Sequence, residues 1–115
     1  MKIALEGPIF KCTDAECKDW RNTVIEKLGK DYTFHNPMDF DCRGKTDELE
    51  QALVDYDTAG LASSDIILVM AETPGWGTAM AIQMAWSMHK IIISICSTKN
   101  ISPWLRNRST FIVKT

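Results

Sequence analysis

The sequence lacks the patterns that mark several large classes of proteins. Its net charge of −2 provides no basic face to attract a polyanion, so we expect no nucleic-acid partner. It has no apolar stretch of the ~18 residues that cross a bilayer, so we expect no membrane partner. Lys2 leads directly into a strand-like run, which predicts no signal peptide and a cytoplasmic protein.

Metal-binding patterns are missing as well. None of the four cysteines forms a CxxC pair, and no histidine lies at metal-finger spacing from them. Cys17 and Cys96 fall on apolar faces, where a reduced core thiol is the ordinary interpretation. We therefore expect no metal and no other cofactor.

The chain does contain an alternation of strand and helix patterns over its whole length. With 115 residues and no repeat or linker, it is predicted to form a single domain, residues 1–115. The predicted strands are residues 3–5, 32–35, 66–70, 91–95 and 110–113. The predicted helices begin at a capping box over residues 13–16, after Thr46 and at Thr78, and a short helical turn surrounds Trp104. The third helix is apolar on nearly every side and is predicted to be heavily buried.

This alternation predicts an α/β fold. Strands separated by helices form a parallel sheet with right-handed crossovers, here with strand order 2-1-3-4-5 and helices on both faces. Ligands bind such sheets beyond the carboxyl ends of the strands, at the point where the strand order reverses. The predicted site therefore lies between residues 7–12 and residues 72–78. The amino end of the third helix points into this crevice and favours negative charge there.

Three segments could supply chemistry at this crevice, and each also has a plain structural interpretation. Residues 6–10 could let a ligand approach the backbone and stack on Phe10, or could form a simple turn. Residues 36–44 form either a binding loop or a solvated connection between elements. Residues 75–81 form either part of a binding site or an ordinary capped start of a helix. Asp57 lies at the flank of the buried face of the second helix, where a carboxylate is either a structural acceptor or part of a site.

Together these segments resemble the nucleoside 2-deoxyribosyltransferase family, including its nucleotide N-hydrolase relatives. Four family motifs match in order across nearly the whole chain. They are AGPxF at residues 2–10, NPM…D-aromatic-RG at 36–44, DxxxIxxxD at 57–65 and GTAxE at 77–85. The resemblance implies a flavodoxin-like (Rossmann-like) domain that cleaves the N-glycosidic bond of 2′-deoxyribonucleosides or their 5′-monophosphates. It also implies transfer of the deoxyribosyl group to another nucleobase or to water.

One position departs from the family in a way that affects the chemistry. Where the GTAxE motif has a glutamate, this chain has Ala81. In relatives that carboxylate attacks the anomeric carbon and holds a covalent deoxyribosyl intermediate, which a methyl group cannot do. The alanine is either an engineered substitution or a natural loss that leaves only binding. A third interpretation is that Glu6, at a position where relatives often carry a small residue, replaces the missing glutamate.

The resemblance also implies roles for other residues. Asp57 would orient the missing glutamate or contact the sugar, so the catalytic positions are Ala81 and Asp57. The implied substrate-binding positions are Gly7, Pro8, Ile9, Phe10, Asp41, Arg43, Trp76, Gly77, Thr78 and Met80. Phosphate-binding relatives carry serines where this chain has Pro8 and Gly75, which slightly favours free deoxynucleosides over 5′-monophosphates.

The sequence leaves alternatives for the activity and the assembly. An enzyme that turns over a nucleoside or nucleotide and a protein that binds one without turnover would use the same pocket. A flavodoxin-like receiver domain is disfavoured because residues 70–72 lack the aspartate that such domains phosphorylate. A neighbouring subunit often completes the pocket of relatives, so we expect a homodimer. Four large side chains suit a dimer face, although core packing is the simpler explanation for them: Met84, Trp86, Met88 and Trp104.

Overall fold

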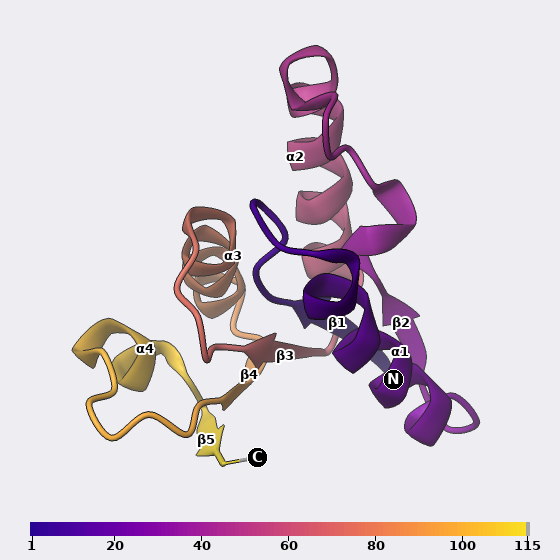
Figure 1. The fold of residues 1–115 in the computed structure, drawn as a ribbon. Coiled ribbons are helices and arrows are strands. Elements are labelled where there is room, and N and C mark those ends of the chain that lie inside the picture. The colour runs from indigo at the N-terminus through magenta and orange to yellow at the C-terminus, as the bar shows by residue number, and fades with distance from the viewer. Residues whose placement is uncertain (115) are drawn as a thin grey trace.

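The sheet has the strand order predicted from the sequence. The computed structural model describes residues 1–114, with residue 46 described by its backbone alone. Five parallel strands lie in the order β2-β1-β3-β4-β5 (Figure 1). They are β1 (Lys2–Glu6), β2 (Thr33–His35), β3 (Ile66–Met70), β4 (Ile91–Ile95) and β5 (Phe111–Val113). Every predicted strand is confirmed to within one residue at each end.

Helices connect the strands on both faces of the sheet. They are the π-helix η1 (Ala15–Asp19), α1 (Trp20–Leu28), the 3-10 helix η2 (Pro37–Phe40), α2 (Thr46–Ser63), α3 (Trp76–Ser87) and α4 (Pro103–Arg108). The predicted capping box is confirmed, because the Thr13 amide donates to Glu16 Oε1 at 3.0 Å and the Glu16 amide donates to Thr13 Oγ1 at 3.2 Å. Right-handed crossovers place α2 and α3 on one face and α1 on the other, as Figure 1 shows.

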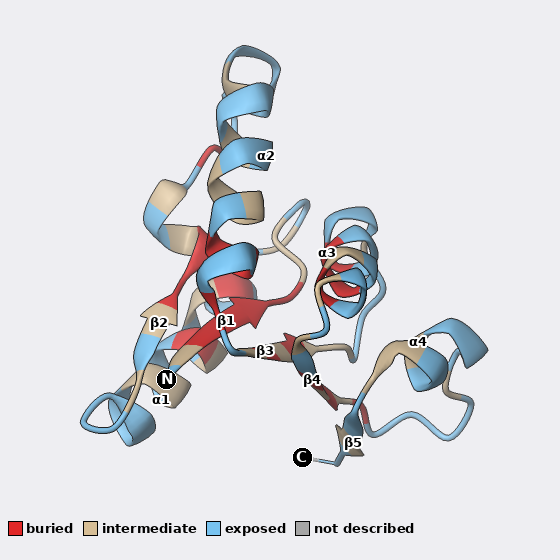
Figure 2. Ribbon diagram, turned by 180° about the vertical axis from the view of Figure 1, so that it is seen from behind, coloured by how far each residue is buried: buried red, intermediate tan, exposed pale blue. Residues whose placement is uncertain are grey.

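The core fills the space between α2, α3 and one face of the sheet. It is built from small and branched apolar residues of three strands and two helices: Ala4, Leu61, Ile67, Val69, Ala81, Ile82, Ala85 and Ile92. The interior strand β1 is buried along almost its whole length (Figure 2). Cys17 and Cys96 are buried free thiols, as their apolar surroundings predict.

The prediction that α3 is heavily buried was wrong for its outer side. Met80 is 62% exposed and Trp86 is 45% exposed, because α3 packs on the sheet with one side only. A helix that is apolar all round carries no polar stripe to show which side faces water. Trp104 in α4 is 75% exposed, so core packing does not explain either tryptophan.

The opposite face of the sheet is only partly covered. In Figure 1, α1 lies under β1 and β2, and within residues 1–114 no helix lies under β3, β4 and β5. Residues in β3 and β4 accordingly alternate between buried and partly exposed positions. One side of these three strands therefore faces α3 and α4, and the other side is open.

Candidate active site

Two strands end beside each other at the predicted crevice and present ionisable side chains to α2. Glu6 is the last residue of β1, and His35 is the last residue of β2. Ala4 pairs with His35 and also belongs to the core beneath α2 and α3. Because side chains alternate along a strand, Glu6 shares the face of Ala4 and points toward the same helices.

Glu6, His35 and Asp57 form a buried polar cluster. Glu6 and His35 are each 5% exposed, and His35 Nε2 lies 3.4 Å from Asp57 Oδ1. The Asp57 side chain, from the middle of α2, is 32% exposed and opens the cluster to solvent. Glu6 Oε1 is buried without a hydrogen-bond partner, and the contact between His35 Nε2 and Asp57 Oδ1 lacks the geometry of a hydrogen bond. Unpaired polar atoms of this kind are expensive to bury and are typical of functional sites.

The environment of Glu6 makes it a carboxyl group that titrates near neutrality. Burial is the main cause that raises its pKa, and the negative charge of Asp57 adds to the effect. The positive charges of His35 and Arg21 act in the opposite direction. The resulting pKa is about 7, against an ordinary value of 4.5, so Glu6 can both give and take a proton at neutral pH.

His35 is held against the backbone of α2 at a glycine. A Cβ atom added at Gly60 would lie 2.3 Å from the imidazole ring, a distance that no side chain can occupy. The Tyr56 ring packs on the same imidazole with a centroid separation of 5.0 Å. Gly60 therefore creates the space in which His35 meets Asp57.

A fully buried arginine fixes the end of β1. Arg21 donates from Nε to the Leu5 carbonyl and from Nη2 to the Gly7 carbonyl, each at 3.0 Å, and from Nη1 to the Cys17 carbonyl. Its guanidinium also lies over the Trp20 ring, 4.6 Å from the centroid. These bonds hold the backbone on both sides of Glu6 and so set the direction of its side chain.

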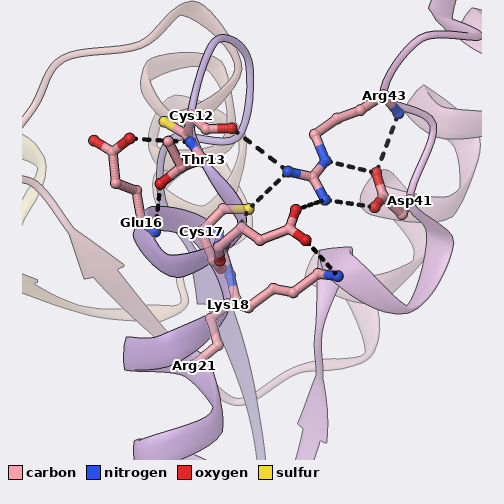
Figure 3. Close-up of polar contacts among 9 residues, drawn as sticks. Cys12, Thr13, Glu16, Cys17, Lys18, Arg21, Asp41 and Arg43 are labelled. Carbon is pink, nitrogen blue, oxygen red and sulfur yellow. Dashed lines mark hydrogen bonds and ion pairs between the residues drawn. The ribbon is translucent and has the colours of Figure 1, made fainter.

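Two of the predicted substrate-binding residues bind one another. Arg43 forms a two-pronged pair with Asp41, with Nε at 3.0 Å and Nη2 at 2.8 Å from the two carboxylate oxygens. Arg43 Nη2 also lies 2.6 Å from Asp14 Oδ1 (Figure 3). The bonds from Arg43 lower the pKa of Asp41 to about 2, so that carboxylate stays charged. This network ties the loop after η2 to the segment that precedes η1.

The other predicted binding residues differ widely in exposure. Phe10, Trp76 and Met80 are exposed, whereas Gly7 and Thr78 are buried. Pro8 and Ile9 are partly buried, and the Gly77 Cα has open space around it. The space beside Gly7 is filled, because an added Cβ atom would lie 2.9 Å from the Trp20 ring. Glycine here serves the packing of that tryptophan.

A cavity of about 630 Å³ lies next to the predicted crevice. Its walls come from the loop between β3 and α3, from α3 itself, and from residues 96–108. Trp104, Ile82, Leu105 and Arg108 are among its lining residues, and its surface is mostly apolar. The predicted crevice and this cavity share residues 72–75 and Thr78. The second wall of the cavity is formed within residues 96–108, where residues 7–12 were expected. Within the described part of the chain, no group of three His, Cys, Asp or Glu residues could hold a metal ion.

Comparisons with known proteins identify the architecture. No family model matches the sequence, and no curated protein matches it either. The CMP N-glycosidase BcmB of Clostridium botulinum aligns with a TM-score of 0.73 over 100% of this chain and 88% of its own, at 18% identity. A 2-deoxyribosyltransferase from Leishmania mexicana aligns with a TM-score of 0.61 over 92% of this chain and 69% of its own, at 18% identity. This chain shares the fold of these two enzymes. A conserved protein from Enterococcus faecalis V583 shares it, with a TM-score of 0.62 over 99% of this chain and 80% of its own, at 19% identity.

In this fold, Ala81 lies two residues deeper in α3 than the sequence indicated. Because α3 begins at Trp76, two residues before the predicted start, Ala81 is in its second turn. It is 7% exposed and packs in the core with Val69, the residue that pairs with Glu6 across β1 and β3. Glu6 and Ala81 therefore approach the same part of the core from the sheet and from the helix.

Sequence reasoning missed two members of the site, His35 and Arg21. The sequence did contain a signal for Arg21. It lies four residues after Cys17 and three before Val24, so it places a charged residue within the apolar stripe of α1. His35 closes a short, weakly apolar strand, and nothing in its local sequence distinguishes it. In the described residues, no helix is long and apolar enough to span a bilayer.

Proposed function

We propose that this chain cleaves the N-glycosidic bond of a nucleoside or nucleotide, with Glu6 supplying the carboxyl group that α3 lacks. The observation that carries the proposal is the cluster of Glu6, His35 and Asp57, in which a buried Glu6 oxygen has no hydrogen-bond partner and His35 pairs with Asp57. The fold supports the substrate class, since solved structures similar to this chain include an N-glycosidase and a deoxyribosyltransferase.

The cluster contains two carboxyl groups in different environments, as glycosidic cleavage requires. Glu6, with a pKa of about 7, is the acid, and the more exposed Asp57 is the base, oriented by His35. Water attacks the anomeric carbon while Asp57 takes its proton. The C–N bond breaks, its electron pair leaves with the base nitrogen, and Glu6 protonates that nitrogen. Proton exchange with solvent returns both carboxyl groups to their starting states.

The finer identity of the substrate follows from the sequence motifs. We propose 2′-deoxyribonucleosides or their 5′-monophosphates, with Phe10 and Trp76 offering exposed rings on which a base can stack. When a second nucleobase takes the place of water, the same groups perform transfer. The Asp41–Arg43 pair would contact the substrate only after its internal bonds rearrange.

Base release tests the proposal directly. The unmodified chain and the variants Glu6→Gln, Asp57→Asn and Ala81→Glu are incubated with the common deoxynucleosides and their 5′-monophosphates, and free base is measured by chromatography. We expect release by the unmodified chain and a loss of at least about 100-fold in Glu6→Gln and in Asp57→Asn. The matched control Glu50→Gln removes an exposed carboxylate from the same helix as Asp57 and should change nothing.

The outcome that contradicts this assignment is equally clear. If Glu6→Gln keeps full activity, Glu6 is not the acid. If only Ala81→Glu releases base, the alanine marks a lost nucleophile and Glu6 does not replace it.

A second candidate function is binding without turnover. The mostly apolar cavity of about 630 Å³ favours it, because this volume suits a nucleoside-sized ligand while no catalytic side chain is required there. Calorimetric titration separates the two functions. A binding protein saturates with a nucleoside or nucleotide that is recovered intact, whereas an enzyme releases the base.

A further inference from the structure

The cavity of about 630 Å³ is separate from the buried polar cluster. It lies between α3 and α4, beyond the carboxyl ends of β3 and β4, and Glu6, His35 and Asp57 are not among its lining residues. Pockets that bind small molecules typically enclose about 300–1,000 Å³. The cavity is therefore large enough for a ligand of its own, and the chemistry of its walls indicates the kind of ligand.

One wall of the cavity presents hydrogen-bond donors. The amino end of α3 borders it, and Gly75, the residue before this helix, has no side chain that could cap the helix. The Ala79 amide donates to the Gly75 carbonyl, so the amides of residues 76–78 have no acceptor within the helix. Thr78 lines the cavity and is only 8% exposed, and its hydroxyl takes part in none of the side-chain hydrogen bonds among the described residues. Buried hydroxyl groups normally have a partner, so this wall fits a ligand atom that accepts hydrogen bonds.

Apolar side chains make up most of the remaining wall. Ile82 of α3 is 8% exposed, whereas Trp104 of α4 lines the same cavity and is 75% exposed. Stacked aromatic rings attract one another beyond the area that they bury. An exposed indole ring beside a mostly apolar cavity therefore favours a flat, aromatic ligand.

The charged residues of the lining already have partners within the protein. They are Glu72 and Arg108. Glu72 accepts a hydrogen bond from the Ser97 amide at 2.8 Å. Arg108 donates from Nε to Gln83 Oε1 at 2.8 Å, and its guanidinium lies 3.8 Å from the centroid of the Trp86 ring. A charged ligand would lose its hydration here without gaining a free counter-charge, and Glu72 would repel an anion such as a phosphate group.

We propose that this cavity binds an uncharged, planar heterocycle that carries a ring carbonyl group. The ring stacks on Trp104. The carbonyl oxygen accepts hydrogen bonds from the Thr78 hydroxyl and from the free amides in the first turn of α3. Hypoxanthine is a suitable probe, because it is planar, uncharged at neutral pH and carries one ring carbonyl.

This inference does not depend on cleavage at the Glu6 cluster, which shares no residue with the cavity. It rests on the second candidate function only in that both place a ligand in this cavity, and it adds the chemical class of that ligand. The two can fail separately. The candidate function is tested with nucleosides and nucleotides, and the inference is tested with a free heterocycle.

Calorimetric titration with hypoxanthine tests the site. We expect the unmodified chain to bind saturably, Trp104→Ala to bind roughly 10-fold more weakly through lost stacking, and Thr78→Val to bind about 5-fold more weakly through the lost hydroxyl. Ala79→Leu, which fills part of the cavity from an exposed position on α3, should abolish binding. The matched control is Phe111→Ala, which removes an exposed aromatic ring of β5 that does not line the cavity and should leave binding unchanged.

Several results would overturn the inference. An unmodified chain that does not bind hypoxanthine would do so, even if it binds a nucleoside, and so would a Trp104→Ala variant that binds as tightly as the unmodified chain. If Trp76→Ala weakens binding and Trp104→Ala does not, the ring lies in the crevice and not in this cavity. If Thr78→Val fails to fold by circular dichroism, Trp104→Ala and Ala79→Leu, both at exposed positions, decide the question.

Discussion

Replacing Glu6 by glutamine should make this protein more stable at alkaline pH. The folded chain buries the Glu6 carboxyl group and raises its pKa from 4.5 to about 7, mainly by burial. Between these two values the folded state holds a proton that the unfolded state has released. Stability must therefore fall as the pH rises from 4.5 to 7 and level off above that range. Glutamine has nearly the same shape and no charge, so the variant should escape this loss.

The size of the effect follows from the pKa. The difference between 4.5 and about 7 corresponds to roughly 3 kcal/mol of unfolding free energy, since each pKa unit is worth about 1.4 kcal/mol. For a chain of 115 residues, that is on the order of 10 °C in melting temperature. Near pH 4.5 the two proteins should melt at similar temperatures, and at pH 8 Glu6→Gln should melt higher by this amount.

Thermal unfolding followed by circular dichroism at pH 4.5, 6, 7 and 8 provides the measurement. Glu50→Gln, which removes an exposed carboxylate from α2, is the control and should follow the unmodified chain at every pH. The pH dependence of groups that do not interact with Glu6 cancels in the difference between Glu6→Gln and the unmodified chain. Equal melting temperatures at pH 8 would refute the reasoning, and a carboxyl group without a raised pKa could not act as the acid in the proposed reaction.

Three further predictions concern the residues that position the site. Gly60→Ala should lower the unfolding free energy by roughly 2 kcal/mol or more in urea denaturation, because the new methyl group meets the His35 ring at 2.3 Å. Gly77→Ala, with open space at its Cα, is its control and should be neutral or slightly stabilising. Arg21→Met should cost about 3 kcal/mol in the same assay, because three buried carbonyls lose a charged donor. Thr13→Ala should cost about 1 kcal/mol through the loss of the capping box, and an unchanged midpoint would show that the cap does not matter.

The fold could be predicted because its central strands carry an unambiguous signal. The runs 66–70 and 91–95 are continuous, apolar and bounded by turns or polar residues, and they match β3 and β4 residue for residue. Their alternation with helices leaves few possible topologies, and the strand order followed from that. The limits lay in α3 and α4, where Trp86 and Trp104 face solvent. An apolar helix surface looks the same in sequence whether it contacts a sheet, a partner or water.

The candidate site was less predictable, since its members come from separate elements. Asp57 stood out because its carboxylate lies at the flank of an apolar stripe, and the structure brings it within 3.4 Å of His35. His35 could not be found, because its importance depends on the missing side chain of Gly60, twenty-five residues later in the chain. The roles assigned to Ala81, Asp41, Arg43 and the loop residues stay predictions.

The convergence of Glu6 and Ala81 on one part of the core affects how such proteins are recognised from sequence. A sequence alignment that scores each position separately counts the unusual glutamate at position 6 and the missing glutamate at position 81 as two unrelated mismatches. In three dimensions the two positions adjoin the same core, since Glu6 pairs with Val69 across the sheet, and Val69 and Ala81 belong to one core cluster. A search for distant relatives of this chain should therefore score these two alignment positions together. It should accept a single carboxylate that comes either from the strand or from the helix.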